Sequence, residues 1–232
     1  MNKFTHNSPQ ETRENEIYKG YGGVLRGNSS LNHNQLSLYV SRPFLVTMEV
    51  KVLWSDETQK LKFEKDSIVV LVDVLRASST IAYALAAGAP AIYLTKDINN
   101  ALAMKDKEPT KTIIGGERGG IQLDGFDVGN SPMMIPELIK KKKKSSVVLC
   151  TGNLCNAISN IPIVKGVIYT VGCLANAKAI AKYILRKKPK RVYFIPVGTY
   201  YMINYKGKLP VYTEEDFLGS LYILNELVKL KK

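Results

Sequence analysis

An acid followed by an arginine and three hydroxyl residues is the first group in this sequence suited to chemistry. Asp73 comes directly after an apolar run over residues 68–72, and Arg76 lies three positions further on. An alanine-rich segment then opens with Ser78, Ser79 and Thr80. Hydroxyls and backbone N–H groups at a helix N-terminus bind anions, and an arginine can hold an oxyanion with two hydrogen bonds. A capping acid paired with Arg76 is the simpler alternative, but a cap needs fewer polar groups.

Glycines frame a second acid and base over residues 115–120. Glu117 and Arg118 stand between two pairs of glycines, and glycine lets a backbone approach a ligand closely. Because an expected strand occupies residues 112–114, we expect a loop at the end of that strand. The segment lacks the Lys-Ser/Thr ending of a phosphate-binding P-loop. A flexible turn with a salt-bridged pair is the alternative, and the four glycines favour a ligand-binding loop.

Two further segments place acids next to expected helix starts. Asn130 and Ser131 are N-cap residue types and Pro132 suits a first helical turn, so capping alone explains these three. Asp127 is left over as a candidate ligand or structural anchor. The three consecutive acids at residues 214–216 favour the dipole of the helix that they open, and clustered carboxylates also hold Mg²⁺. The sequence leaves both roles open for these acids.

Strands and helices alternate from about residue 48 onward. The run at residues 67–72 is typical of a strand buried on both faces, and residues 214–230 show helical spacing of apolar positions. Such alternation predicts an α/β fold with a mainly parallel sheet and helices on both faces, with ligand sites at the carboxyl ends of strands. The expected strands are 49–53, 67–72, 91–94, 112–114, 147–150, 166–169 and 192–196, and the expected helices are 78–87, 98–104, 132–143, 175–185 and 214–230.

The first 47 residues differ in composition from the rest. They are rich in Asn, Ser and Gly and show no sustained periodicity. We therefore expect two parts: a short, poorly ordered N-terminal extension at residues 1–47 and a folded domain at residues 48–232. A disordered extension and a stretch upstream of the native start both account for residues 1–47, and the sequence does not decide between them.

The composition is that of an ordinary globular protein. Hydrophobic residues make up 45% and charged residues 23% of the 232 residues, and no apolar run approaches the roughly 18 residues of a membrane span. The polar first 16 residues do not resemble a signal peptide, so we expect a cytoplasmic protein. The cysteines lack paired metal spacing, which favours buried free thiols in a reducing compartment: Cys150, Cys155 and Cys173.

The net charge of +13 raises the question of an anionic partner. Two basic clusters, at residues 140–144 and 186–191, each fall between an expected helix and an expected strand. Cations at a helix C-terminus favour the helix dipole, which accounts for both clusters. No basic motif interleaved with aromatic residues accompanies them, so we expect neither a nucleic-acid partner nor a membrane partner.

Taken together, the motifs are specific. The segments Asp73-Val-Leu-Arg-Ala-Ser, Gly115-Gly-Glu-Arg-Gly-Gly and Gly125-Phe-Asp-x-Gly-Asn-Ser-Pro, in this order and spacing, resemble the 2-phosphosulfolactate phosphatase family. The resemblance covers most of the chain from about residue 48. It implies an α/β enzyme that uses Mg²⁺ to hydrolyse 2-phosphosulfolactate to sulfolactate and phosphate, an early step of coenzyme M biosynthesis.

One segment departs from the family pattern. Where the family usually shows a Thr-Thr-Asn-Gly-Thr-Arg-like stretch, residues 150–156 read Cys-Thr-Gly-Asn-Leu-Cys-Asn. Thr151 and Asn153 fit the pattern, whereas Asn156 stands in place of the arginine and so removes one anion contact. The Gly-Ser-Leu-x-Asn segment of the family is matched more closely by Gly-Cys-Leu-Ala-Asn at residues 172–176.

The predicted site combines these residues with the resemblance. Asp73 and Glu117 are expected as metal ligands or as catalytic acid and base, with Asp216 as the next metal ligand and Mg²⁺ as the cofactor. Arg76 and Arg118 are counted with the catalytic residues because they can bind the anionic groups of the substrate. The expected substrate-binding residues are Ser78, Ser79, Thr80, Gly116, Gly119, Asn130, Ser131, Thr151 and Asn153.

Other functions stay open at this point. The altered segment at residues 150–156 also fits a phosphatase for another small 2-phospho-carboxylate, or a divergent relative that binds an anionic metabolite without hydrolysing it. A nucleic-acid-associated protein has only the net charge in its favour. The expected partner is a small anionic phosphorylated substrate, and the sequence leaves homo-oligomer formation open.

Overall fold

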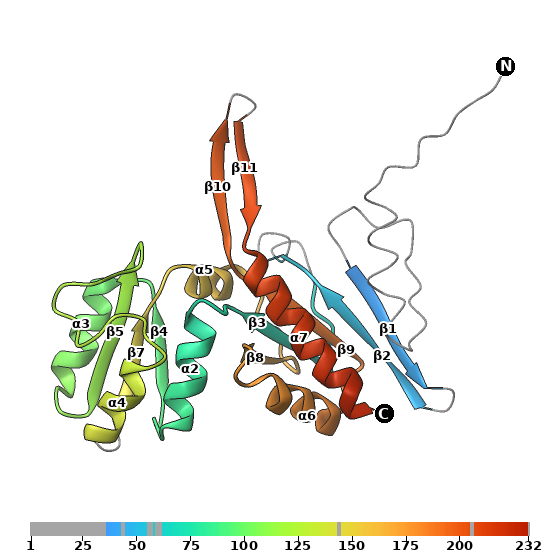
Figure 1. Cartoon of the computed structure of the whole chain (residues 1–232), viewed down its shortest axis with the longest axis horizontal. Helices are drawn as coiled ribbons and strands as arrows, with labels where there is room; N and C mark the ends of the chain where they lie inside the picture. Colours follow the sequence, from blue (N-terminus) through green and yellow to red (C-terminus); the bar gives the residue numbers. More distant parts are fainter. Residues whose placement is uncertain are drawn as a thin grey trace.

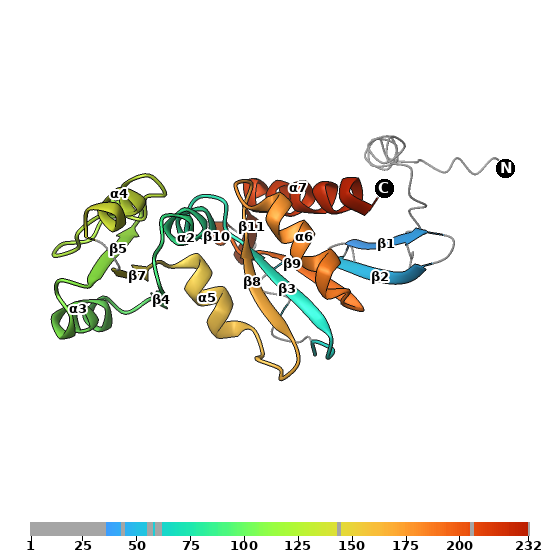
Figure 2. The same cartoon turned by 90° about the horizontal axis from the view of Figure 1, so that it is seen from below.

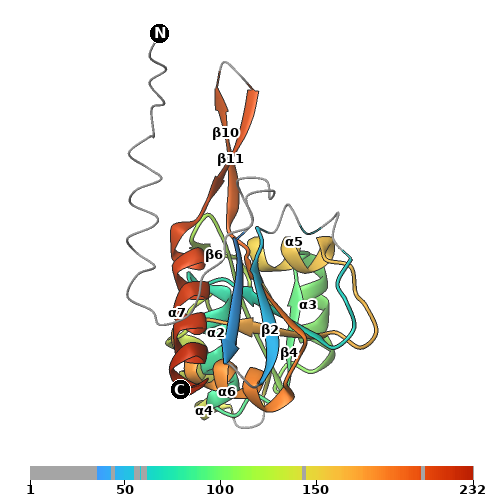
Figure 3. The ribbon, with the colours of Figure 1, turned by 90° about the vertical axis from the view of Figure 1, so that its right-hand side faces the viewer.

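The described residues form two β-sheets of mostly parallel strands with helices packed against them (Figure 1). Strands and helices alternate along the chain, which confirms the α/β fold class. A two-stranded hairpin, β10–β11, projects from the body (Figures 1 and 3). The computed structural model describes residues 36–42, 45–54, 58, 62–142, 145–204 and 207–231.

The larger sheet has the strand order β1-β2-β9-β3-β8, and all neighbours are parallel except β1 and β2. β3 lies between β9 and β8, and each of its residues is buried, as its continuous apolar run predicts. Its alternate residues Val70 and Val72 share a buried cluster with Ile180 of α6 and Ile223 of α7, so these helices cover one face. The elements are β1 (Leu36–Arg42), β2 (Leu45–Val52), β3 (Ser67–Val72), β8 (Ile168–Gly172), β9 (Arg191–Pro196), α6 (Ala177–Lys187) and α7 (Glu214–Lys231).

The smaller sheet has the order β4-β7-β5-β6, and within it only the short β6 is antiparallel to its neighbour. On one face, Ala101 of α3 shares a buried cluster with Ile114 and Val148. On the other face, Ile135 of α4 belongs to the same buried cluster as Ile113. The elements are β4 (Ile92–Thr95), β5 (Thr112–Arg118), β6 (Ile121–Gln122), β7 (Ser146–Cys150), α3 (Ile98–Lys107) and α4 (Met134–Lys141).

Two helices, α2 (Ala77–Ala86) and α5 (Asn153–Asn160), connect the sheets and lie between them (Figure 2). The chain leaves the larger sheet after β3 through α2 and returns from β7 through α5. One buried cluster contains side chains from both sheets and both helices, including Leu71, Leu149 and Leu154. The two sheets are therefore joined by a shared core at the point where the chain crosses between them.

Each predicted strand and helix has a counterpart in the structure. The predicted domain start at residue 48 falls inside β2, and β1 lies within the predicted extension, whereas residues 1–35 lie outside the described residues. The sequence pattern did not indicate α5, β6 or the hairpin strands. The hairpin consists of β10 (Thr199–Asn204) and β11 (Gly207–Tyr212).

The predicted loop at residues 115–118 was wrong, because β5 continues through these residues to Arg118. A Cβ atom on Gly116 would lie 2.6 Å from the carbonyl oxygen of Cys150, in the neighbouring strand β7. The first glycine pair therefore allows strands to pack closely. The second pair forms the turn into β6 with positive φ angles, 59° at Gly119 and 84° at Gly120.

The cysteines and the basic clusters lie where the sequence predicts. All three cysteines are free and buried, and burial raises the pKa of the Cys155 thiol. Basic residues occupy the last turns of α4 and α6, immediately before β7 and β9. Within the described residues, no helix combines the length and apolar character that crossing a membrane requires.

Replacing Gly116 by alanine should destabilise the fold. The added methyl group would collide with backbone of β7, and we expect a loss of about 1–3 kcal/mol in the free energy of unfolding, as for other overpacked cores. Thermal unfolding followed by circular dichroism measures this change. Gly129→Ala is the matched control, because its new Cβ would meet its nearest atom at 3.8 Å. Equal melting temperatures for the two variants would contradict the close-packing role of Gly116.

Candidate active site

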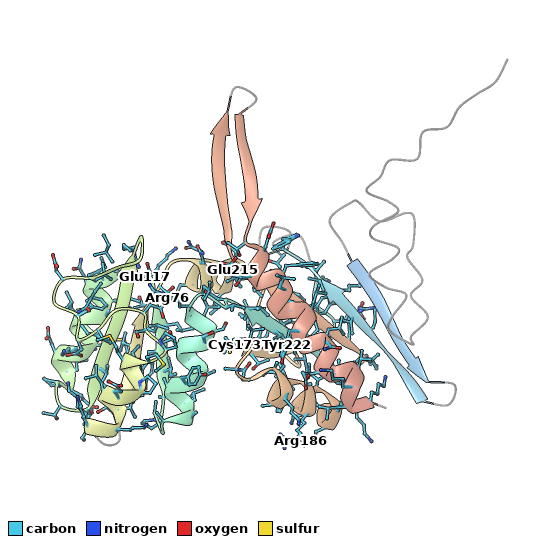
Figure 4. All side chains as sticks on the ribbon, in the orientation of Figure 1. Arg76, Glu117, Cys173, Arg186, Glu215 and Tyr222 are labelled. Atoms are coloured by element: carbon cyan, nitrogen blue, oxygen red, sulfur yellow. The ribbon has the colours of Figure 1, made fainter. Side chains whose placement is uncertain are left out.

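A pocket of about 620 Å³ opens where the two sheets meet, at the carboxyl ends of β3, β5 and β7. Arg76 and Glu117 belong to opposite sides of this junction and lie close together in Figure 4. Most of the residues that line the pocket were predicted from the sequence. The full lining is Asp73, Leu75, Arg76, Glu117, Arg118, Gly119, Gly120, Asn130, Thr151, Gly152 and Asn153.

Asp73 stands in a tightly bonded turn between β3 and α2. Its carboxylate accepts a hydrogen bond from the N–H of Ala77 at 3.0 Å, and its own N–H donates to Oγ of Ser78 at 3.0 Å. Oγ of Ser79 donates to the carbonyl oxygen of Val74 at 2.7 Å. The hydroxyls of Ser78 and Ser79 thus hold the backbone of the turn, and neither residue lines the pocket as the substrate-binding prediction required.

The carboxyl group of Asp73 is in an environment that disfavours its charge. Asp73 is 5% exposed, and the pKa of its carboxyl is raised to about 7, chiefly by burial. The negative charges of Asp216 and, more weakly, Glu117 also contribute to this rise, while the hydrogen bond from Ala77 acts in the opposite direction. A carboxyl that titrates near neutral pH can accept and release a proton under working conditions. The same repulsion makes the position attractive to a cation.

Glu117 and Arg118 reach the pocket from the end of β5. The Glu117 carboxylate accepts a hydrogen bond from the N–H of Gly120 at 2.8 Å, which fixes it across the β5–β6 turn. The Arg118 guanidinium donates to the carbonyl oxygens of Glu117 at 2.8 Å and Lys96 at 2.6 Å. The second carboxylate oxygen of Glu117 has no hydrogen-bond partner among the described residues and is available to a ligand.

Asn130 links the helix that follows Asp73 to the smaller sheet. Oγ1 of Thr80 donates to Oδ1 of Asn130 at 2.7 Å, and both residues are buried. Thr80 is therefore a support rather than a pocket residue, whereas Asn130 lines the pocket. The Asn130 amide NH₂ has no hydrogen-bond partner among the described residues, so it can donate to an anion. Ser131 instead accepts a hydrogen bond from the N–H of Met134 at 3.1 Å in the turn before α4, whose N-cap is Met133, and it does not line the pocket.

The N-terminus of α5 opens into the pocket. Gly152 is its N-cap, Asn153 is its first residue, and no side chain caps this end. The partial positive charge and free N–H groups of a helix N-terminus bind anions. Thr151, which is buried, completes this side of the pocket. The sequence prediction included Thr151 and Asn153 but missed Gly152 and the helix, although four apolar residues have helical spacing there: Leu154, Ala157, Ile158 and Ile161.

Asp216 lies behind the Asp73 turn and does not line the pocket. Its carboxylate accepts hydrogen bonds from the N–H of Val74 at 2.7 Å, the N–H of Gly198 at 2.9 Å and Oγ1 of Thr213 at 3.0 Å. Burial raises the pKa of Asp216, and these three hydrogen bonds act against that rise. Its oxygens are thus occupied by protein donors.

Asp127 is a structural anchor of the smaller sheet. Its carboxylate accepts a hydrogen bond from the N–H of Ile114 at 2.9 Å and forms ion pairs with Lys105 and, at 3.9 Å, Lys142. Burial disfavours the charge of this carboxylate. The hydrogen bonds from Lys105 and Ile114 and the positive charges of Lys105 and Lys142 outweigh burial, so the pKa of Asp127 is lowered. It therefore ties α3, β5 and α4 together.

Gly116 likewise serves packing inside β5 and does not line the pocket.

The carboxylates of the pocket suit a magnesium ion whose remaining ligands are substrate and water. Mg²⁺ in proteins is usually held by one or two carboxylates together with substrate phosphates and water molecules. Asp73 and Glu117 supply two carboxylates to one pocket, and the negative charge of Glu117 disfavours the charge of Asp73. Among the described residues, no group of three or more His, Cys, Asp and Glu side chains is arranged to hold a metal. The structure therefore narrows the candidate ligands to Asp73 and Glu117.

The fold and the pocket together have the features of an α/β enzyme, in which paired acids and arginines meet at strand ends beside an open helix N-terminus. A sequence model described as 2-phosphosulpholactate phosphatase matches residues 53–232, which is more than half of the chain. The chain belongs to the 2-phosphosulfolactate phosphatase family, a family of phosphoric monoester hydrolases. The resemblance inferred from the three motifs is thereby confirmed.

Curated relatives carry the same family name. A probable 2-phosphosulfolactate phosphatase of Carboxydothermus hydrogenoformans is 38% identical over 185 residues, covering 80% of this chain and 70% of the relative. One from Clostridium tetani is 32% identical over 183 residues, with coverages of 78% and 72%. One from Synechococcus sp. WH7803 is 38% identical over 167 residues, with coverages of 71% and 62%. The matched stretch is therefore shorter than each of these proteins.

Replacing Asp73 by asparagine should stabilise the metal-free protein at neutral and alkaline pH. A carboxyl whose pKa rises from 3.8 to about 7 on folding costs nothing below pH 3.8, and its cost grows as the pH rises to about 7. Above pH 7 we expect Asp73→Asn to gain about 2–4 kcal/mol over the wild type, and at pH 3.5 almost nothing. Chemical unfolding in EDTA at both pH values measures the difference.

Asp106→Asn provides the matched control for this comparison. Asp106 is an exposed carboxylate on α3, so its replacement should change stability little at either pH. A gain for Asp73→Asn that is equal at pH 3.5 and pH 8 would show that charge burial is not its cause.

Proposed function

We propose that this protein hydrolyses 2-phosphosulfolactate to sulfolactate and phosphate with Mg²⁺ as cofactor. The observation that carries the proposal is the meeting of Asp73 and Glu117 with Arg76 and Arg118 in one pocket between the sheets. Membership of the 2-phosphosulfolactate phosphatase family supports the same reaction. The name of the relatives supports 2-phosphosulfolactate as the substrate.

The charges of the pocket suit the charges of this substrate. 2-Phosphosulfolactate carries a phosphate, a carboxylate and a sulfonate, and these groups need cations and N–H donors. The Arg76 guanidinium has no hydrogen-bond or ion-pair partner among the described residues, so it is free to bind an oxyanion. Further donors are the Asn130 amide, the N-terminus of α5 and the remaining N–H groups of Arg118. These donors come from different segments of the chain that line the pocket, which suits a molecule with three separate anionic groups.

The protein side chains can be given roles in hydrolysis. A bound Mg²⁺ supplies charge neutralisation of the phosphoryl group and its orientation for in-line attack, and Asp73 and Glu117 are the residues that would hold it. Arg76 and the N-terminus of α5 bind phosphoryl oxygens. One of the two acids accepts the proton of the attacking water while the P–O ester bond breaks, and the alcohol oxygen of sulfolactate takes up a proton. We place this reaction in coenzyme M biosynthesis, as the family resemblance implies.

The reaction is tested by phosphate release from 2-phosphosulfolactate and from a panel of other 2-phospho-carboxylates, each with and without Mg²⁺. We expect release that depends on Mg²⁺ and is confined to the sulfonated compound. Release from another member of the panel would support a phosphatase, but one with a different substrate. A folded protein that binds 2-phosphosulfolactate but releases no phosphate from any compound would contradict hydrolysis and identify a non-catalytic binder.

Asp73→Asn and Glu117→Gln should each abolish turnover and leave the protein folded. Both replacements keep the size of the side chain and remove the negative charge, so circular dichroism should remain that of the wild type. Asp106→Asn, outside the pocket, should keep full activity. Wild-type turnover in either pocket variant would show that the replaced residue is not part of the active site.

Magnesium alone should stabilise the wild type. An ion that binds only the folded state raises the melting temperature as its concentration rises. We expect this shift at pH 7.5 for the wild type and for Asp106→Asn, and its loss in Asp73→Asn and Glu117→Gln. An undiminished shift in both pocket variants would place the ion elsewhere.

A further inference from the structure

The turn that carries Asp73 is tied to a distant part of the chain by one carboxylate. Asp216, in the first turn of α7, is separated from Val74 by 142 positions, and its Oδ1 accepts the hydrogen bond from the Val74 N–H at 2.7 Å. Asp216 is 3% exposed, so this bond is shielded from water. The residue next to Asp73 is therefore held by an element outside α2.

The other oxygen of the same carboxylate holds both ends of the hairpin. Oδ2 accepts hydrogen bonds from Gly198, immediately before β10, and Thr213, immediately after β11. These two residues also bind each other, because the N–H of Thr213 donates to the carbonyl oxygen of Gly198 at 3.0 Å. A Cβ on Gly198 would lie 2.8 Å from Oδ2 of Asp216 and 1.9 Å from Oγ1 of Thr213, so this junction has no room for a side chain.

Close packing holds α7 against the same turn. A Cβ on Gly219, one turn after Asp216, would lie 2.5 Å from Cγ2 of Val74. The helix backbone therefore contacts the Val74 side chain directly, while Asp216 binds the Val74 N–H. Two independent contacts from α7 thus fix the position of residue 74.

The remaining bonds of the turn are local. Ser78 and Ser79 bind the backbone of residues 73 and 74 from the first turn of α2 and would move together with that helix. Among the described side chains, only that of Asp216 forms hydrogen bonds both to this turn and to the base of the hairpin. Its carboxylate does not line the pocket, so it can act on the reaction through the turn that it holds and through its charge, which raises the pKa of Asp73.

We propose that Asp216 is a positioning residue for Asp73, which fixes the Asp73–Arg76 turn in the pocket from the base of the hairpin. The proposal rests on the proposed function, since it assigns the turn its role in hydrolysis. Misplacing a reacting group by about 1 Å can cost on the order of 100-fold in rate. Loss of the Asp216 carboxylate should therefore lower turnover although Asp216 does not contact the substrate.

The test compares Asp216→Ala with Thr213→Val. Both variants lose a hydrogen bond at the same buried carboxylate and should melt at lower temperature than the wild type, but only Asp216→Ala releases the Val74 N–H. We expect kcat to fall about 100-fold in Asp216→Ala with a much smaller change in KM, and to stay within about 3-fold of the wild type in Thr213→Val. A kcat of Asp216→Ala within 3-fold of the wild type, measured below its melting temperature, would overturn the proposal.

Amide hydrogen exchange gives a readout that does not need turnover. In the wild type the Val74 amide should be as strongly protected as the amides of β3, and in Asp216→Ala the segment 73–76 should exchange faster. An unprotected Val74 amide in the wild type would overturn the proposal, even if Asp216→Ala does not fold. If the wild type releases no phosphate from any compound, the proposed function fails, and exchange at residues 73–76 still decides whether Asp216 holds the turn.

Discussion

The shared core between the two sheets is the constraint on which the pocket depends. The chain crosses between the sheets through α2 and α5, and the buried faces of both helices pack with strands of both sheets. Each crossing begins at the carboxyl end of a strand, where regular hydrogen bonding stops and side chains become available. The pocket therefore forms at the crossing points, and a change in the packing of α2 or α5 would move its two sides apart.

The pocket at this junction contains both acidic and basic groups, which suits a ligand that carries both positive and negative charge. Asp73 and Glu117 reach the pocket from different sheets, and burial together with neighbouring acids keeps the pKa of Asp73 high. Arg76, Arg118 and the N-terminus of α5 supply positive potential in the same space. A phosphorylated anion with a bound cation, which is the ligand that we propose, would relieve both kinds of repulsion at once.

Local signals account for what could be read from the sequence. The buried run of β3 and the helical spacing of α7 each depend on residues near one another in the chain. The short helix α5 was missed although its apolar residues have helical spacing, because three of its eight residues are asparagines, which are weak helix formers. No strand was predicted for the residues of the β10–β11 hairpin either.

The sequence by itself determined the α/β class, the order of most of the elements, the family and the two acids and two arginines of the pocket, because these four residues lie at or just after the ends of strands whose apolar runs are visible in the sequence. Only the tertiary structure decided which polar residues face the pocket. The turn is supported by Ser78 and Ser79, and Asn130 is supported by Thr80. Gly116 allows a close contact between strands, and Asp216 binds three protein donors behind the site. The reason is that a side chain's role depends on distances to residues far away in the chain, and the packing of the two sheets sets those distances.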